Sequence, residues 1–327
     1  MDAGKLLRSL MIVGAFSFPF LPKSAWAGEV VIPDPVLNAA VRQALGIPAP
    51  TPILEEDMAC LDVLWVRNPG VGDLTGLEHA VNLSLAVLTH GSIADLSPLT
   101  NLSNLSSLDV TDNAIADLRP VEHLPKLRAL DFAQNNVTNL APLATMTQLG
   151  KLDLSRNPVS DLSALMPLAS SLSSLYLSGL SLSDLSGFGS FSGLHVLDIS
   201  ENDVSDIQPI ASMLELGFLA MAKNQVADIS PLASLEHLEH AQLCDNVISD
   251  ISPLAGLSRL EWLDLSSNPL SREAYDIYIP QILRNNPGIG LIYDPIPEPL
   301  TGSLLGLGLM WVWQRRSPRV GPGFRSA

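Results

Sequence analysis

The chain has 327 residues, of which 47% are hydrophobic and 16% are charged, and its formal net charge is −16. The imbalance lies in residues 28–299, which carry 33 acidic and only 11 basic side chains. A surface of this sign repels a phosphate backbone, so we expect no nucleic-acid partner.

Residues 1–27 are predicted to be a secretory signal peptide. Lys5 and Arg8 form a basic start, and a 13-residue apolar run follows. Ala25 and Ala27 then place small residues at the two positions that a signal peptidase inspects. The run is shorter than the roughly 20 residues of a membrane-spanning helix. We therefore expect cleavage after Ala27 and a mature chain that begins at Gly28 outside the cytosol.

Residues 28–60 are predicted to form a helical cap. Asp34 can cap a helix, Pro35 suits its first position and Gly46 can end it. One face of this helix is apolar, through Leu37, Val41 and Leu45. A second short helical piece is expected within residues 51–61.

Residues 61–270 contain a sequence repeat with the pattern LxxLxLxxNx(I/V)xD(L/I)xPLxxLxx. Each repeat has 22 residues, except the one from Leu149 to Leu172, which has 23. The ten repeats start at Leu61, Leu83, Leu105, Leu127, Leu149, Leu172, Leu194, Leu216, Leu238 and Leu260. This period and spacing are those of leucine-rich repeats. They predict an α/β solenoid of about ten coils with a parallel sheet on its concave face, about 45 Å long.

The recurring residues of the repeat have separate structural tasks. Leucines at positions 1, 4 and 6 face inward, because one coil alone cannot bury them. An asparagine ladder is expected from position 9: Asn113, Asn135, Asn157, Asn202, Asn224, Asn246 and Asn268. Turn caps are expected from position 13: Asp73, Asp95, Asp117, Asn139, Asp161, Asp184, Asp206, Asp228 and Asp250. Proline at position 16 then fixes the outer turn.

The fifth and sixth repeats depart from this pattern. The fifth carries the extra residue and has its proline at Pro167, and the sixth has Leu180 in place of asparagine and Gly187 in place of proline. We expect a bulge in the outer loop near 163–170, a loss of ladder hydrogen bonds at this junction, and a strand that continues in phase.

Residues 271–294 are predicted to form a helix and a final strand that close the last coil. The repeats and their two caps resemble the 22-residue repeats of internalin-type bacterial proteins over about residues 30–294. The resemblance implies a non-enzymatic binding module and leaves open whether the ligand is a protein or a glycan. A structural matrix component without a discrete ligand is the alternative.

Residues 295–327 form a distinct tail. Pro297, Glu298 and Pro299 precede a mostly apolar segment, 300–314, which Arg315 and Arg316 follow. This order resembles the PEP-CTERM sorting signal of Gram-negative bacteria. The resemblance implies transient membrane insertion, removal by an exosortase-type enzyme, and delivery to the cell envelope or extracellular matrix. A plain C-terminal membrane anchor is the alternative, and the 11 residues after the arginine pair depart from the family pattern.

The candidate ligand site lies on the concave face, at repeat positions 3 and 5. It comprises Tyr176, Asp198, Phe218, His240, Trp262 and Asp264. We expect an exposed aromatic row beside carboxylates, which suits a protein hot spot or a sugar ring. In the alternative interpretation, the aspartates are solvated repeat filler and Trp262 packs under the C-terminal cap.

No other motif predicts a catalytic residue, a cofactor or a metal site. His237 and His240 fall on different surfaces of the coil, and Gly187, Gly189 and Gly193 lie in an outer turn without the strand and helix of a phosphate loop. Cys60 and Cys244 fall about 40 Å apart, too far for a disulfide. We expect Cys244 to be partly exposed.

Overall fold

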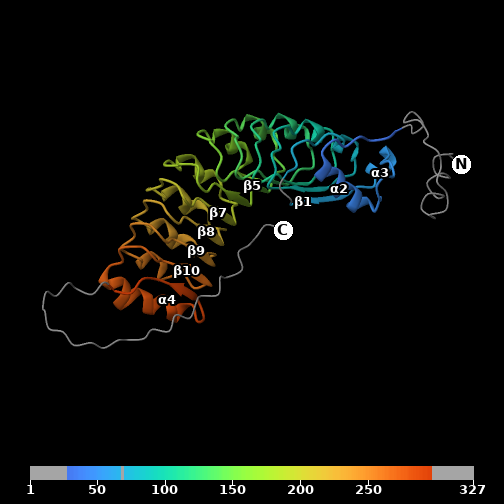
Figure 1. The fold of residues 1–327 in the computed structure, drawn as a ribbon. Helices are drawn as coiled ribbons and strands as arrows, with labels where there is room; N and C mark the ends of the chain where they lie inside the picture. The colour runs from blue at the N-terminus through green and yellow to red at the C-terminus, as the bar shows by residue number, and fades with distance from the viewer. Residues whose placement is uncertain (1–27, 68–69, 297–327) are drawn as a thin grey trace, which may run out of the picture. The chain divides into compact units, whose positions relative to one another are not determined.

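The computed structural model describes residues 28–67 and 70–296. The predicted signal peptide and the tail from Pro297 onward lie outside these residues. Coils are stacked in chain order, and every neighbouring pair of strands is parallel, which confirms the predicted repeat fold (Figure 1). The eleven strands are β1 (Val63–Val66), β2 (Leu85–Leu88), β3 (Ser107–Asp109), β4 (Ala129–Asp131), β5 (Lys151–Asp153), β6 (Ser174–Tyr176), β7 (Val196–Asp198), β8 (Phe218–Ala220), β9 (His240–Gln242), β10 (Trp262–Asp264) and β11 (Gly290–Ile292).

Short 3-10 helices form the outer side of the coils. They are η2 (Leu77–His79), η3 (Ser97–Leu99), η4 (Arg119–His123), η5 (Ala141–Thr145), η6 (Ser163–Leu168), η7 (Ser186–Ser190), η8 (Gln208–Ser212), η9 (Ser230–Ser234) and η10 (Ser252–Leu254). The position 13 side chain accepts a hydrogen bond from the amide two residues on, as between Asp228 and Ser230 at 2.8 Å. The predicted turn caps are therefore confirmed.

The strand register places equal repeat positions beside each other. Leu108 pairs with Leu130, and Leu130 with Leu152, so that each inward leucine stacks on its neighbours. The pairing continues through Leu175 and Leu197 across the 23-residue repeat. These leucines are at most 1% exposed. The inner strand therefore stays in phase, as predicted.

The asparagine ladder joins consecutive coils. Asn135 Nδ2 donates to Phe132 O in its own coil at 3.0 Å and to Val110 O in the preceding coil at 2.9 Å. Its Oδ1 accepts the Ile115 amide at 2.9 Å. Since these backbone groups are buried, an apolar residue at this position would leave them without partners.

The sixth coil lacks this ladder member. Asn202 of the next coil compensates in part, because its Oδ1 accepts both the Leu180 amide at 3.0 Å and the Leu182 amide at 2.9 Å. The extra residue of the fifth repeat falls in the outer turn containing η6, which has six residues where the other 3-10 helices have three to five.

A chain of ion pairs also crosses the sixth coil. Glu201 contacts Arg156 at 2.9 Å and Lys223 at 2.7 Å. Arg156 passes over Gly179, where a methyl group would come within 3.1 Å of Arg156 Cγ. Gly179 has a φ of 69°, so glycine meets both the conformational and the steric demand of this position.

Both ends of the stack are capped as predicted. Helix α2 (Pro35–Leu45) begins at Asp34 and ends at the left-handed Gly46, and α3 (Glu55–Met58) follows. Burial alone would raise the pKa of Asp34, but backbone amides, first that of Gly72, lower it below its ordinary value. At the other end lie the π-helix η11 (Ala274–Tyr278), α4 (Ile279–Asn285) and β11, which pairs with β10. Within 28–67 and 70–296, no helix is long and apolar enough to span a membrane.

Candidate binding face

The register brings the predicted aromatic residues together. Phe218, His240 and Trp262 lie directly beside one another on β8, β9 and β10. Tyr176 pairs with Asp198, whereas Ala220 and Gln242 separate Asp198 from Asp264 along the same row. The predicted set is therefore two groups on one surface and not one compact cluster.

The aromatic row is half-buried, and the expectation that it would be exposed is wrong. The Phe218 and His240 rings stack with centroids 6.1 Å apart and an interplanar angle of 29°. Trp262 packs close to Gly290 of β11, where a methyl group would come within 3.0 Å of Trp262 Cδ1. The tight strand spacing brings the Phe218 and His240 rings against each other. Packing of Trp262 against the C-terminal cap is thus part of its environment.

Three of the position 5 aspartates, Asp131, Asp153 and Asp198, are not solvated filler. Burial raises the pKa of Asp153 to about 6, helped by the nearby Asp131 and Asp198 carboxylates, although hydrogen bonds from Ser155 lower it. Burial likewise raises the pKa values of Asp131 and Asp198. On β3, β4 and β5 the register places Asp109, Asp131 and Asp153 next to one another, so the repeat itself creates this environment.

Lys151 belongs to the same surface, although sequence reasoning did not include it. Its Nζ lies 3.0 Å from Asp131 Oδ2 and 5.7 Å from the centre of the Tyr176 ring. Lys151 occupies position 3 of the fifth repeat, the same repeat position as Phe218, His240 and Trp262, so the sequence places it in the same row. Only the register shows that its ammonium group reaches the carboxylates of the position 5 row.

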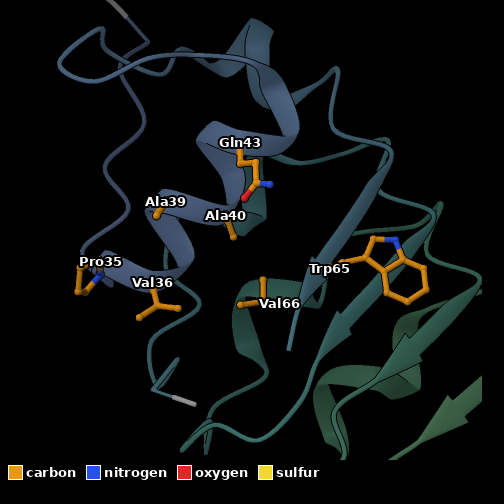
Figure 2. A pocket seen from close by; sticks show the side chains of 7 residues that line it. All are labelled: Pro35, Val36, Ala39, Ala40, Gln43, Trp65 and Val66. Carbon is orange, nitrogen blue, oxygen red and sulfur yellow. The ribbon is translucent and has the colours of Figure 1, made fainter. Parts of the chain in front are cut away.

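A second apolar area at the N-terminal end was also missed. Trp65 and Val63 of β1 are 47% and 39% exposed, and the Arg67 guanidinium lies 4.8 Å from the Trp65 ring centre. An open pocket of about 340 Å³ lies between α2 and β1. Its lining residues are shown in Figure 2: Pro35, Val36, Ala39, Ala40, Gln43, Trp65 and Val66. Trp65 occupies position 5 of the first repeat, so the repeat frame could have predicted its place on the strand face.

The remaining candidates for chemistry are the two cysteines, possible metal ligands and a glycine-rich turn. Cys60 and Cys244 are unpaired. Cys244 is buried and not partly exposed as expected. Burial, followed by the Asp264 and Asp245 charges, raises the pKa of its thiol to about 11. In the described part of the chain, no group of three or more potential metal ligands lies together. Gly187 and Gly189 fall in η7, the outer turn predicted for them.

Comparison with known proteins agrees with this geometry. Residues 125–165 match the family model "Leucine Rich repeats (2 copies)". Comparison with curated proteins gave no match. Internalin InlF from Listeria monocytogenes is 27% identical over 84% of this chain and 86% of that chain, with a TM-score of 0.68. Internalin C2 from the same organism is 30% identical over 73% of this chain and 92% of that chain, with a TM-score of 0.52.

The same fold occurs in the plant peptide hormone receptor RGFR1, whose structure is a complex with RGF2. That receptor is 20% identical over 69% of this chain and 37% of its own, with a TM-score of 0.54, and shows the fold alone. Fold and repeat together define a leucine-rich repeat solenoid, a class of scaffold with an extended concave binding surface. The chain belongs to the leucine-rich repeat proteins of the internalin type.

Proposed function

We propose that this chain is an exported, non-enzymatic module that binds an extracellular protein on its concave face. The observation that carries the proposal is the aromatic row of Phe218, His240 and Trp262 beside the small buried residue Ala220. Aromatic side chains in partly desolvated positions are the usual anchors of protein interfaces. The plant receptor, recorded with its peptide hormone, supports a protein ligand as a use of the same fold.

Binding affinity of point variants tests this proposal. Phe218→Ala and Trp262→Ala should each weaken binding of the purified chain to a partner by about 1–2 kcal/mol or more, with an unchanged thermal melt. Leu214, 53% exposed outside the strand face, supplies the matched control Leu214→Ala, which should leave the affinity unchanged. An unchanged affinity in the Phe218→Ala/Trp262→Ala variant would reject the site. A failure to find saturable binding to any extracellular protein or polysaccharide of the source bacterium would favour a structural matrix component.

We also propose that the tail sorts the protein to the cell envelope or extracellular matrix. Pro297, Glu298, Pro299, Arg315 and Arg316 support this by their order around an apolar segment. An exosortase-type enzyme would recognise the tail and remove it after transient membrane insertion of 300–314. Intact-mass measurement of the native protein should show that residues 1–27 and the tail near Pro297 are absent. A mature protein with an intact C-terminus would instead mark a membrane anchor.

A further inference from the structure

We propose that the middle of the concave face, over β3 to β7, selects a partner protein that inserts a lysine or arginine side chain among its carboxylates. This inference rests on the proposed binding function and names the chemistry of the partner. The residues concerned, here called the acidic column, are Asp109, Asp131, Asp153 and Asp198.

The register aligns the acidic column across neighbouring strands. Asp109 pairs with Asp131, and Asp131 with Asp153. Tyr176 separates Asp153 from Asp198. Four strand spacings of about 4.8 Å join β3 to β7, so the column is about 19 Å long. An extended peptide of about six residues has the same length.

The acidic column has more carboxylate oxygens than the ammonium group of Lys151 can pair with. Lys151 is the ammonium group that reaches it, and it pairs with Asp131 Oδ2 at 3.0 Å. Asp131 is 8% exposed, and its Oδ1 has no hydrogen-bond partner among the described residues. Arg156, whose charge acts on Asp198, is engaged with Glu201 at 2.9 Å. A partner cation would therefore meet uncompensated negative charge.

The surroundings of the acidic column favour a cationic side chain over other ligands. The Tyr176 ring lies between Asp153 and Asp198 and offers a face over which an ammonium or guanidinium group can lie, as Lys151 does at 5.7 Å. Burial raises the pKa values of Asp131, Asp153 and Asp198, and neighbouring column carboxylates add to the rise for Asp131 and Asp153. A cation bound among these carboxylates favours their charged form and offsets that cost. An acidic polysaccharide or a nucleic acid is repelled, and a neutral glycan gains nothing from the charges.

Charge-matched variants distinguish this column from the acidity of the whole chain. Asp153→Asn/Asp198→Asn removes two charges from the column, and each asparagine carbonyl can still accept the amide two residues on, as Asp153 now accepts that of Ser155 at 2.8 Å. Glu122→Gln/Glu215→Gln removes two charges from exposed residues outside the strand face. The probe is end-labelled hexalysine, with hexaglutamine as the neutral peptide, and fluorescence anisotropy reports the binding of each peptide.

Hexalysine should bind saturably, and the column variant should weaken that binding at least about fivefold. The outer-surface variant should change it by less than about twofold, because exposed charges at a distance are screened. Equal losses in the two variants, absent saturation, or equally strong binding of hexaglutamine would overturn the inference. Phe218→Ala/Trp262→Ala should leave hexalysine binding intact. A partner that requires the aromatic row but is indifferent to the column variant would refute this inference and leave the proposed function standing.

Discussion

Aspartate at position 5 of the repeat lies on a strand of the concave sheet, and the neighbouring strand is only about 4.8 Å away. The sequence shows Asp131, Asp153 and Asp198 but not their environment, because the neighbours that bury each one come from coils about 22 residues away. Aspartate also recurs at position 13, but there the pKa shifts in the opposite direction. There, hydrogen bonds from the backbone and side chain of Ser230 lower the pKa of the exposed Asp228.

Asp153→Asn should therefore stabilise the fold at about pH 7.5. A carboxyl whose pKa is raised in the folded state, from 3.8 to about 6, carries no penalty below its unfolded pKa and a full penalty above about pH 6. The gain in the free energy of unfolding should be about 1–3 kcal/mol at about pH 7.5 and should vanish near pH 3.5. Denaturant unfolding at the two pH values measures it.

Asp228→Asn is the control with the opposite sign. Its carboxylate has a lowered pKa, so it contributes stability above its unfolded pKa that is lost on acidification. This variant should be less stable than the parent near neutral pH. A gain for Asp153→Asn that does not change with pH would show that the raised pKa is not its cause.

On the scale of one coil, the period of the leucines and the position of asparagine were enough to predict the strand, the ladder and the outer turn. One backbone feature was missed. The residue before the ladder asparagine has a positive φ in consecutive coils, including Gln134, Arg156, Glu201 and Lys223, at 56–57°. Such a conformation costs a non-glycine residue about 1 kcal/mol. The ladder hydrogen bonds offset that cost. The residue types at position 8 vary, so the sequence does not reveal the positive φ.

The sixth coil should be the weakest point of the ladder. Its Leu180 cannot donate the hydrogen bonds that Asn224 makes to Ile199 O at 2.9 Å and to Met221 O at 3.1 Å. Amide hydrogen exchange should therefore be faster in residues 163–190 than in the flanking coils. Uniform protection along the stack would contradict this account.

Introducing the same defect elsewhere gives a direct comparison. Asn224→Ala should create a second fast-exchanging coil and lower the free energy of unfolding by about 2–4 kcal/mol, because buried backbone groups lose their partners. An exposed asparagine on the outer surface, Asn136, provides the control variant Asn136→Ala, which should change neither quantity measurably. Equal effects of the two variants would show that the ladder does not carry this stability.

For the whole molecule, the sequence predicted the stack and its two caps because each coil repeats the same packing problem. It predicted the binding face less completely. Phe218, His240 and Trp262 could be placed side by side from the repeat frame alone. Their partial burial depends on ring stacking and on Gly290 of the cap, and the contribution of Lys151 depends on a side chain that reaches across to the neighbouring strand.

Hydroxyl-radical footprinting of the chain with and without its bound partner tests the central claim most directly. Oxidation of Tyr176, Phe218, His240 and Trp262 should fall on binding, while Leu214 outside the strand face should react as before. This outcome would place the partner on the concave sheet. Unchanged oxidation of these four residues, with protection confined to the outer 3-10 helices, would contradict the account.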